Sequence, residues 1–214
     1  MDENPIHKTV KDIPKEGDTV QLENVKFPRS WSFWESYLAK GKKLNYTDSM
    51  KAIYEWDNLI AFWQFWNSYP GAEATSLFFD GNKIKYYFNE QYRINAMNVF
   101  VKGVAPAWED KENKGGKYLQ LDYKIDKDLD KFFALVSVAW KKLMLNTMGQ
   151  NIPASENING VRFVDKTQFE RGRIIMFRFE IWLNKKATNE KIEELKEYLK
   201  KELGCGAIET KNIE

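Results

Sequence analysis

The chain has 214 residues, long enough for one domain with a full core, and its 43% hydrophobic and 30% charged content is ordinary for a soluble globular protein. Its net charge of +2 is too small to mark a nucleic-acid binder by overall field, so any phosphate recognition has to rest on a few placed cations. The single Cys205 excludes an internal disulfide and fits a reducing compartment, while the lone His7 argues against histidine catalysis or a zinc site. No apolar run approaches the roughly 18 residues of a membrane span and no signal-peptide core opens the chain, so we expect a monomeric cytoplasmic domain.

The first part of the chain is expected to contain a tail, a strand, a helix and a hairpin. Residues 1–17 are polar and are predicted to form a flexible tail. Dense aromatic residues over Trp31–Leu38 predict a strand. Apolar residues recur at helical spacing over Asp57–Tyr69, until Pro70-Gly71 ends the pattern, and the Asp-Gly pair within Phe78–Ile84 is typical of a tight hairpin.

The second part is expected to contain two strands and two helices. Lys117–Tyr123 alternates cleanly and predicts a strand with Leu119, Leu121 and Tyr123 on one face. A largely apolar helix is predicted over Asp128–Leu145, and an amphipathic helix over Thr188–Leu203, with Gly204 placed to end it.

The predicted strand Arg173–Leu183 brings charged and aromatic side chains together. Its period of two places Arg178, Glu180 and Trp182 on one face and the apolar residues between them on the other. Taken alone, this pattern favours a surface arginine beside a half-buried tryptophan over a binding site.

Strands that alternate with three separated helices predict an α+β domain over residues 18–214, with the helices on one side of a sheet. No repeat or low-complexity tract interrupts it.

Trp108 and Glu109 form the most informative pair, inside Pro106–Leu119, where Gly115-Gly116 and several lysines follow. Such a ring can stack on a purine, the carboxylate can accept from N–H groups of the base, and the lysines can meet phosphate. In isolation, a tryptophan at a strand end is more often part of the core.

The chain resembles the eukaryotic translation initiation factor 4E family over roughly residues 20–204. Several landmarks in the same order carry the resemblance, and together they are more specific than any one motif. They are Trp31, Trp34, Phe62-Trp63, Gly103, Pro106–Asp110, Gly115-Gly116 and Ile181-Trp182. The resemblance implies a curved antiparallel sheet with three helices on its convex face and a site for the mRNA cap on its concave face, in agreement with the α+β prediction.

In that family, 7-methylguanine lies between two aromatic rings. The resemblance assigns one ring to Trp108 and the other to Tyr46, where the family usually has tryptophan. Because methylation at N7 makes the base cationic, each ring face adds a cation–π attraction of about 0.5–2 kcal/mol. The resemblance also implies that Glu109 pairs with the base N1–H and amino groups and that Trp182 contacts the methyl group.

The resemblance places phosphate-binding cations at three positions. Lys117 and Lys166 stand where the family usually has arginine, and Arg178 stands where it has lysine. Exchange of the two types keeps the charge and changes the bonding geometry. The chain is longer than usual before Arg178, so Arg171 or Arg173 are alternatives to Lys166.

The resemblance also implies a partner surface on the convex face, which receives a short helical motif (Tyr, four residues, Leu, apolar) from 4G-like scaffold proteins or 4E-binding proteins. Trp63, Leu59 and Pro28 match positions that meet this motif. On the second helix, Leu135 replaces an acidic residue that pairs with a basic motif residue, and Val138 lies beside it. We therefore expect the ordinary motif to bind poorly and a more apolar surface to be used.

An insertion relative to the family falls within residues 70–98 and contains Phe78–Phe88, where aromatic residues and lysines interleave. These residues could stack on further nucleotides, or form an extra hairpin packed on the sheet edge.

The expected function is cap binding that recruits a scaffold protein for translation initiation, by a protein that is not an enzyme and uses no cofactor or metal. A cap-binding repressor of the same family is one alternative, and a general single-strand RNA binder is another, which predicts steep salt dependence and no preference for N7 methylation. A hydrolase acting on caps is the least favoured, because no carboxylate motif suited to Mg²⁺ is recognisable.

Overall fold

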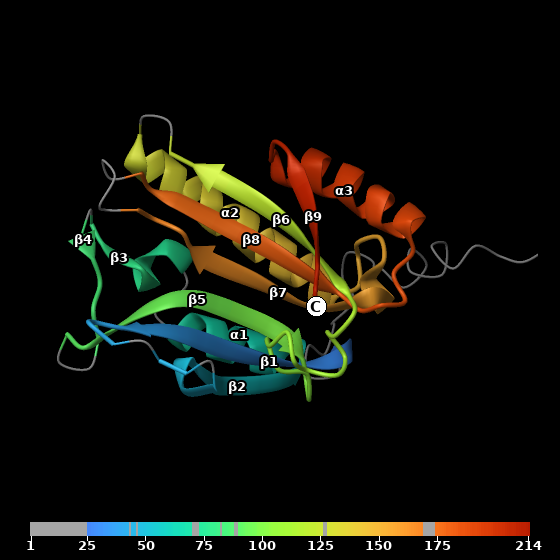
Figure 1. Ribbon diagram of the computed structural model, residues 1–214, viewed down its shortest axis with the longest axis horizontal. Coiled ribbons are helices and arrows are strands. Elements are labelled where there is room, and N and C mark those ends of the chain that lie inside the picture. The colour runs from blue at the N-terminus through green and yellow to red at the C-terminus, as the bar shows by residue number, and fades with distance from the viewer. Residues whose placement is uncertain are drawn as a thin grey trace, which may run out of the picture.

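The computed structural model describes residues 25–42, 44–45, 47–69, 73–81, 83–87, 90–125, 128–168 and 174–214. The expected tail, residues 1–17, lies outside them. The described residues form a curved seven-stranded antiparallel sheet with helices against one face, so the α+β prediction is confirmed (Figure 1). Its strand order is β2-β1-β5-β7-β8-β6-β9, with β1 Lys26–Ala39, β2 Met50–Asn58, β5 Tyr92–Val101, β6 Lys117–Lys124, β7 Ile158–Asp165, β8 Met176–Leu183 and β9 Ile208–Asn212.

The three predicted helices are confirmed as α1 Leu59–Ser68, α2 Leu129–Met148 and α3 Asn189–Leu203. The residue before each helix caps it, because its side chain accepts a hydrogen bond from a backbone N–H of the first turn. These capping residues are Asn58 for α1, Asp128 for α2 and Thr188 for α3. Gly204 ends α3 with a positive φ of 60°, which glycine adopts without steric cost. Within the described part of the chain, no helix has the length and apolar character needed to cross a membrane.

The alternation of side chains divides the sheet into two faces. Leu119, Leu121, Phe177 and Phe179 are fully buried and point toward the helices, which cover the convex face. The alternate residues of the same strands are largely polar and lie on the concave face, which is turned toward the viewer in Figure 1. This face is therefore the open one, and the core lies behind it.

The insertion forms a short helical turn, Ala74–Leu77, and a small hairpin of β3 Phe79–Asp80 and β4 Lys83–Ile84, which confirms the predicted hairpin. Phe78 and Phe79 are buried, and Phe78 packs against Phe163 at 5.1 Å and Phe177 at 5.8 Å between ring centroids. Both rings belong to the core and are not available to nucleotides. Tyr86 differs, since it is partly exposed and has the Lys40 ammonium 5.3 Å from its ring centroid.

Candidate functional site

Trp108 and Glu109 lie in the loop that joins β5 to β6, where both are exposed; 53% of the tryptophan surface is accessible. A large aromatic side chain that stays exposed next to a carboxylate is not used for packing. The alternative that Trp108 belongs to the core is therefore excluded, and its ring faces solvent.

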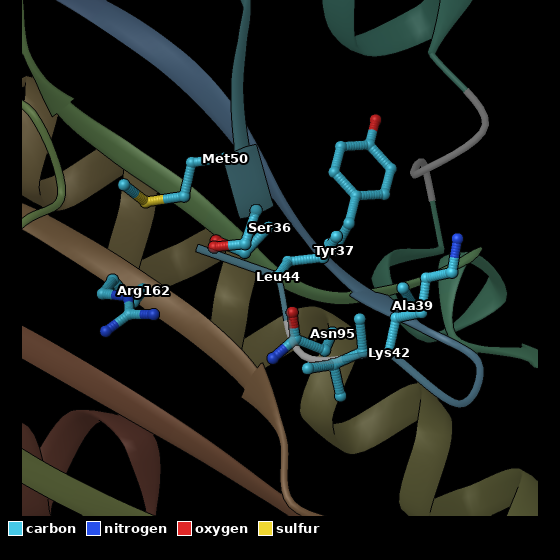
Figure 2. A pocket seen from close by; sticks show the side chains of 10 residues that line it. Ser36, Tyr37, Ala39, Lys42, Leu44, Met50, Asn95 and Arg162 are labelled. Carbon is cyan, nitrogen blue, oxygen red and sulfur yellow. The ribbon is translucent and has the colours of Figure 1, made fainter. Parts of the chain in front are cut away.

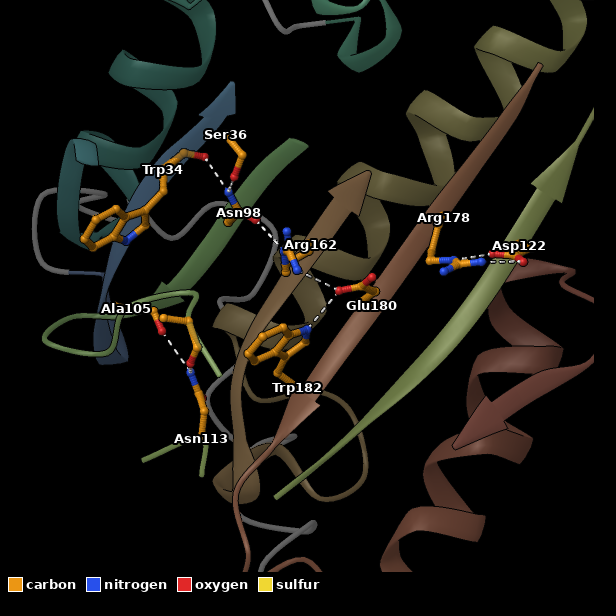
Figure 3. A network of polar contacts seen from close by, with 11 residues as sticks. Trp34, Ser36, Asn98, Ala105, Asn113, Asp122, Arg162, Arg178, Glu180 and Trp182 are labelled. Atoms are coloured by element: carbon orange, nitrogen blue, oxygen red, sulfur yellow. Dashed lines mark hydrogen bonds and ion pairs between the residues drawn. The ribbon is translucent and has the colours of Figure 1, made fainter. Parts of the chain in front are cut away.

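Buried polar groups hold this loop in shape. The Asn113 side chain is fully buried and donates to the carbonyl oxygens of Ala105 and Ala107, both at 2.8 Å (Figure 3). Its Oδ1 accepts from Asn159 at 2.9 Å, and Asp110 Oδ2 accepts from the Ala105 N–H at 2.9 Å. The buried Asn113 side chain is thereby fully used in hydrogen bonds, and together these bonds fix the loop that presents Trp108.

A connected polar network crosses the concave face (Figure 3). Arg162 on β7 donates from Nε to Asn98 Oδ1 at 2.7 Å and from Nη1 to Glu180 Oε2 at 3.1 Å. Glu180 Oε2 also accepts from Trp182 Nε1 at 3.0 Å. The predicted face of Arg178, Glu180 and Trp182 is present, and Arg162 from the neighbouring strand completes it.

Trp182 has no exposed surface. Its ring stacks on Tyr118 with a centroid separation of 5.9 Å, meets Phe100 edge-on at 5.5 Å, and carries the Arg162 guanidinium 5.4 Å from its centroid. Contact between this indole and a ligand, as the family resemblance implies, would require one of these neighbours to move.

The cations on the concave face differ in how firmly they are paired. Arg178 makes two bonds to the Asp122 carboxylate, at 2.7 and 3.0 Å; burial alone would lower its pKa, but the bonds and charge of Asp122 raise it. Lys166 lies after β7; loss of surrounding water and the positive charges of Arg178 and Arg162 lower its pKa, and the charges of Glu180 and Asp122 offset this in part. Among the described residues Lys166 has no carboxylate within ion-pair distance, so an anionic ligand would relieve this repulsion.

Lys117 does not join this group. It lies on β6, two and four residues before Leu119 and Leu121, so the alternation of a strand places it on the same, helix-covered face. Its ammonium donates to Asn189 Oδ1 at 2.9 Å. The structure therefore does not bring Lys117 together with Lys166 and Arg178, and its role in phosphate binding stays a prediction. Tyr46, Arg171 and Arg173 lie outside the described residues, and the expectations for them stay untested.

A hollow of about 630 Å³ opens on the concave face beside Arg162 (Figure 2). Its size is in the range of small-molecule sites in proteins. It is lined by residues of four strands and of the β1–β2 connection, the segment that contains Tyr46. The lining residues are Ser36, Tyr37, Leu38, Ala39, Lys42, Leu44, Ser49, Met50, Asn95 and Arg162.

The predicted partner positions lie on the opposite face. Leu59 and Trp63 on α1 are partly exposed, and Pro28 is exposed on β1, which the hydrogen bond from Leu59 N–H to the carbonyl oxygen of Val25 holds against the start of α1.

On α2, Leu135 and Val138 are 57% and 60% exposed, an unusual state for large apolar side chains of a helix whose other face is core. Beside them, a second hollow of about 490 Å³ lies between α2 and the insertion. Among the residues the structure describes, no cluster of three or more His, Cys, Asp or Glu side chains is arranged to hold a metal ion.

Comparison with known proteins agrees with this geometry. A family model described as Eukaryotic initiation factor 4E matches residues 26–214. The eukaryotic translation initiation factor 4E of Candida albicans is 26% identical over 190 residues, which cover 87% of this chain and 78% of that protein.

Two solved structures show the same fold. The initiation factor 4E-3 of Ascaris suum with an m7G cap has a TM-score of 0.64 at 18% identity and covers 88% of this chain and 91% of its own. The Schistosome factor complexed with m7GpppG and 4E-BP has a TM-score of 0.63 at 17% identity and covers 88% of each chain.

Proposed function

Since the chain belongs to the eukaryotic initiation factor 4E family, we propose that it binds the 7-methylguanosine 5′ cap of mRNA on its concave face and recruits a scaffold protein of translation initiation through its helices. It acts in the cytoplasm, by binding and not by catalysis, and its ligand is the cap. The exposed Trp108 and Glu109, on a loop fixed by buried hydrogen bonds, are the observation that carries this proposal. The cap analogues bound by the Ascaris suum and Schistosome factors support it.

Recognition of the base rests on charge. The cationic methylated base stacks on Trp108, with Tyr46 on its other face, and each ring adds about 0.5–2 kcal/mol that an unmethylated base does not receive. Glu109 accepts from the N1–H and amino groups of the base. Because its partner is cationic, each of these bonds is stronger than a bond between neutral groups.

Recognition of the phosphates rests on Lys166 and Arg178. Arg178 is already held by Asp122, so it offers a fixed positive charge. Burial and, after it, cationic neighbours lower the pKa of Lys166, so this side chain gains from an anion that offsets both effects.

The direct test is a titration of tryptophan fluorescence with 7-methyl-GTP and, separately, with GTP. We expect saturable quenching at least about tenfold tighter for the methylated ligand, a difference that two cation–π faces can supply. Trp108→Ala should abolish it, and Leu135→Ala, on the opposite face, should leave it unchanged. Equal, weak and salt-sensitive quenching by both nucleotides would instead indicate a general single-strand RNA binder.

The convex surface distinguishes an initiation factor from a repressor of the same family. Leu135 and Val138 present an apolar surface where an acidic side chain would pair with a basic motif residue, so we expect a standard scaffold-motif peptide to bind poorly. This specific observation makes a cap-binding repressor, which does not recruit the usual scaffold, the second candidate. Calorimetry with such a peptide tests the point: unimpaired affinity would contradict the expectation and favour the initiation factor.

A further inference from the structure

Of Arg162 and Trp182, the arginine is the one that the concave face offers to a ligand. The guanidinium lines the hollow (Figure 2), whereas the indole beneath it has no exposed surface. The two are 5.4 Å apart, so the arginine occupies the ring face that a cationic base would use.

The position of Arg162 is fixed from both sides. Asn98, which accepts its Nε–H, is fully buried and donates to the Trp34 carbonyl oxygen at 3.2 Å and to Ser36 Oγ at 3.0 Å. Glu180, which accepts from Nη1, is also buried. Displacement of the arginine would leave the buried Glu180 carboxylate with Trp182 Nε1 as its remaining side-chain donor among the described residues, which is costly.

The chemistry of a guanidinium then decides which base it prefers. Arginine has five N–H donors, and two of them are used by Asn98 and Glu180, so others are available to the hollow. In the proposed cap complex, Glu109 holds the N1 and amino edge of the guanine. The N7 edge of the base is then free to meet Arg162. An unmethylated guanine offers acceptors at N7 and O6, the pair that arginine recognises in nucleic acids. A methylated N7 is no longer an acceptor and carries positive charge.

We propose that Arg162 is a specificity-determining residue that narrows the preference of this chain for N7-methylated over unmethylated guanine. This inference rests on the proposed cap-binding function. It gives the arginine, and not Trp182, the contact with the N7 edge of the base.

The test is a double substitution, Arg162→Met with Glu180→Gln. It removes both charges together, and the glutamine oxygen can still accept from Trp182 Nε1. We expect the ratio of the dissociation constants for GTP and 7-methyl-GTP to rise roughly tenfold or more, the scale of one hydrogen bond to a charged group. An unchanged ratio in a folded variant would overturn the proposal.

Arg29→Met is the matched control. Arg29 also lies over a buried tryptophan, 5.0 Å from the Trp31 ring centroid, and its guanidinium donates to the carbonyl oxygens of Ile158 and Ser155. It does not line the hollow, so its removal should leave the ratio unchanged; an equal rise would show a non-specific effect and overturn the proposal.

A measurement on the unsubstituted protein does not depend on the folding of a variant. 7-Deaza-GTP lacks the N7 acceptor without gaining charge, so we expect it to bind roughly threefold or more weakly than GTP. Equal affinities would overturn the proposal. If the unsubstituted protein binds neither cap analogue nor GTP, the cap-binding function fails; if it prefers the methylated cap while these ratios do not move, only the role of Arg162 fails.

Discussion

Asn113 is expected to determine how firmly the loop that carries Trp108 is held, and its replacement by alanine gives a quantitative test. The side chain makes three hydrogen bonds, to the carbonyl oxygens of Ala105 and Ala107 and from Asn159, at 2.8, 2.8 and 2.9 Å. At about 1 kcal/mol each, the free energy of unfolding should fall by about 3 kcal/mol if the loop stays closed. If the loop opens locally instead, the fall is smaller and the cost appears as weaker binding through Trp108.

The two costs can be measured separately. Urea denaturation gives the stability of Asn113→Ala, and the fluorescence titration with 7-methyl-GTP gives its affinity. Asn146→Ala is the control, because Asn146 is an α2 residue whose amide donates to the Tyr198 hydroxyl at 3.2 Å, on the helix side of the sheet. It should cost about 1 kcal/mol and leave affinity unchanged. Wild-type stability together with wild-type affinity in Asn113→Ala would refute the reasoning.

Three further changes test other parts of the structure. Gly116→Ala should lower the free energy of unfolding by about 3 kcal/mol in urea denaturation, because an added Cβ would lie 2.1 Å from a backbone carbonyl oxygen of β8. Gly115→Ala, with φ of +74° but open space around it, should cost about 1 kcal/mol, and equal losses would contradict the difference. Burial raises the pKa of Asp165, so the native state binds this proton more readily than the unfolded chain and gains stability as pH falls through that pKa. Asp165→Asn gives up the ion pair with Arg93 at 3.5 Å but stays neutral at every pH, so its stability relative to the wild type should fall as the pH is lowered, and a relative stability that rises on acidification would contradict the reasoning. Leu135→Glu should tighten binding of a scaffold-motif peptide with a basic residue roughly threefold in calorimetry, and weaker binding would count against the assigned position.

Local periodicity was sufficient for much of the fold. The three helices, the hairpin of the insertion and the shared face of Arg178, Glu180 and Trp182 follow from spacing and end signals, because these depend on neighbouring residues. The period-two alternation of a strand places Lys117 on the same face as Leu119, toward the core, whereas the family resemblance assigns it to the phosphates on the other face.

Other features depend on contacts that no local pattern contains. Arg162 could have been identified from alternation, since it stands between the apolar residues Val161 and Phe163 in the sequence. Asn113 could not, because its partners are backbone carbonyls of a turn whose shape is set only on folding. The burial of Trp182 depends on Phe100, which is brought to it by the sheet order.

The residue that follows β9, Ile213, contacts the loop that carries Trp108. Ile213 accepts from the Gly115 N–H at 3.1 Å, donates to the Gly116 carbonyl oxygen at 2.9 Å, and is buried in one cluster with Trp182 and Val104. Opening of β9 and loosening of the loop are therefore linked events, and linkage is reciprocal. A ligand that steadies the loop should slow hydrogen exchange at the Ile213 amide, and a molecule that separates β9 from β6 should weaken the ligand by the same factor.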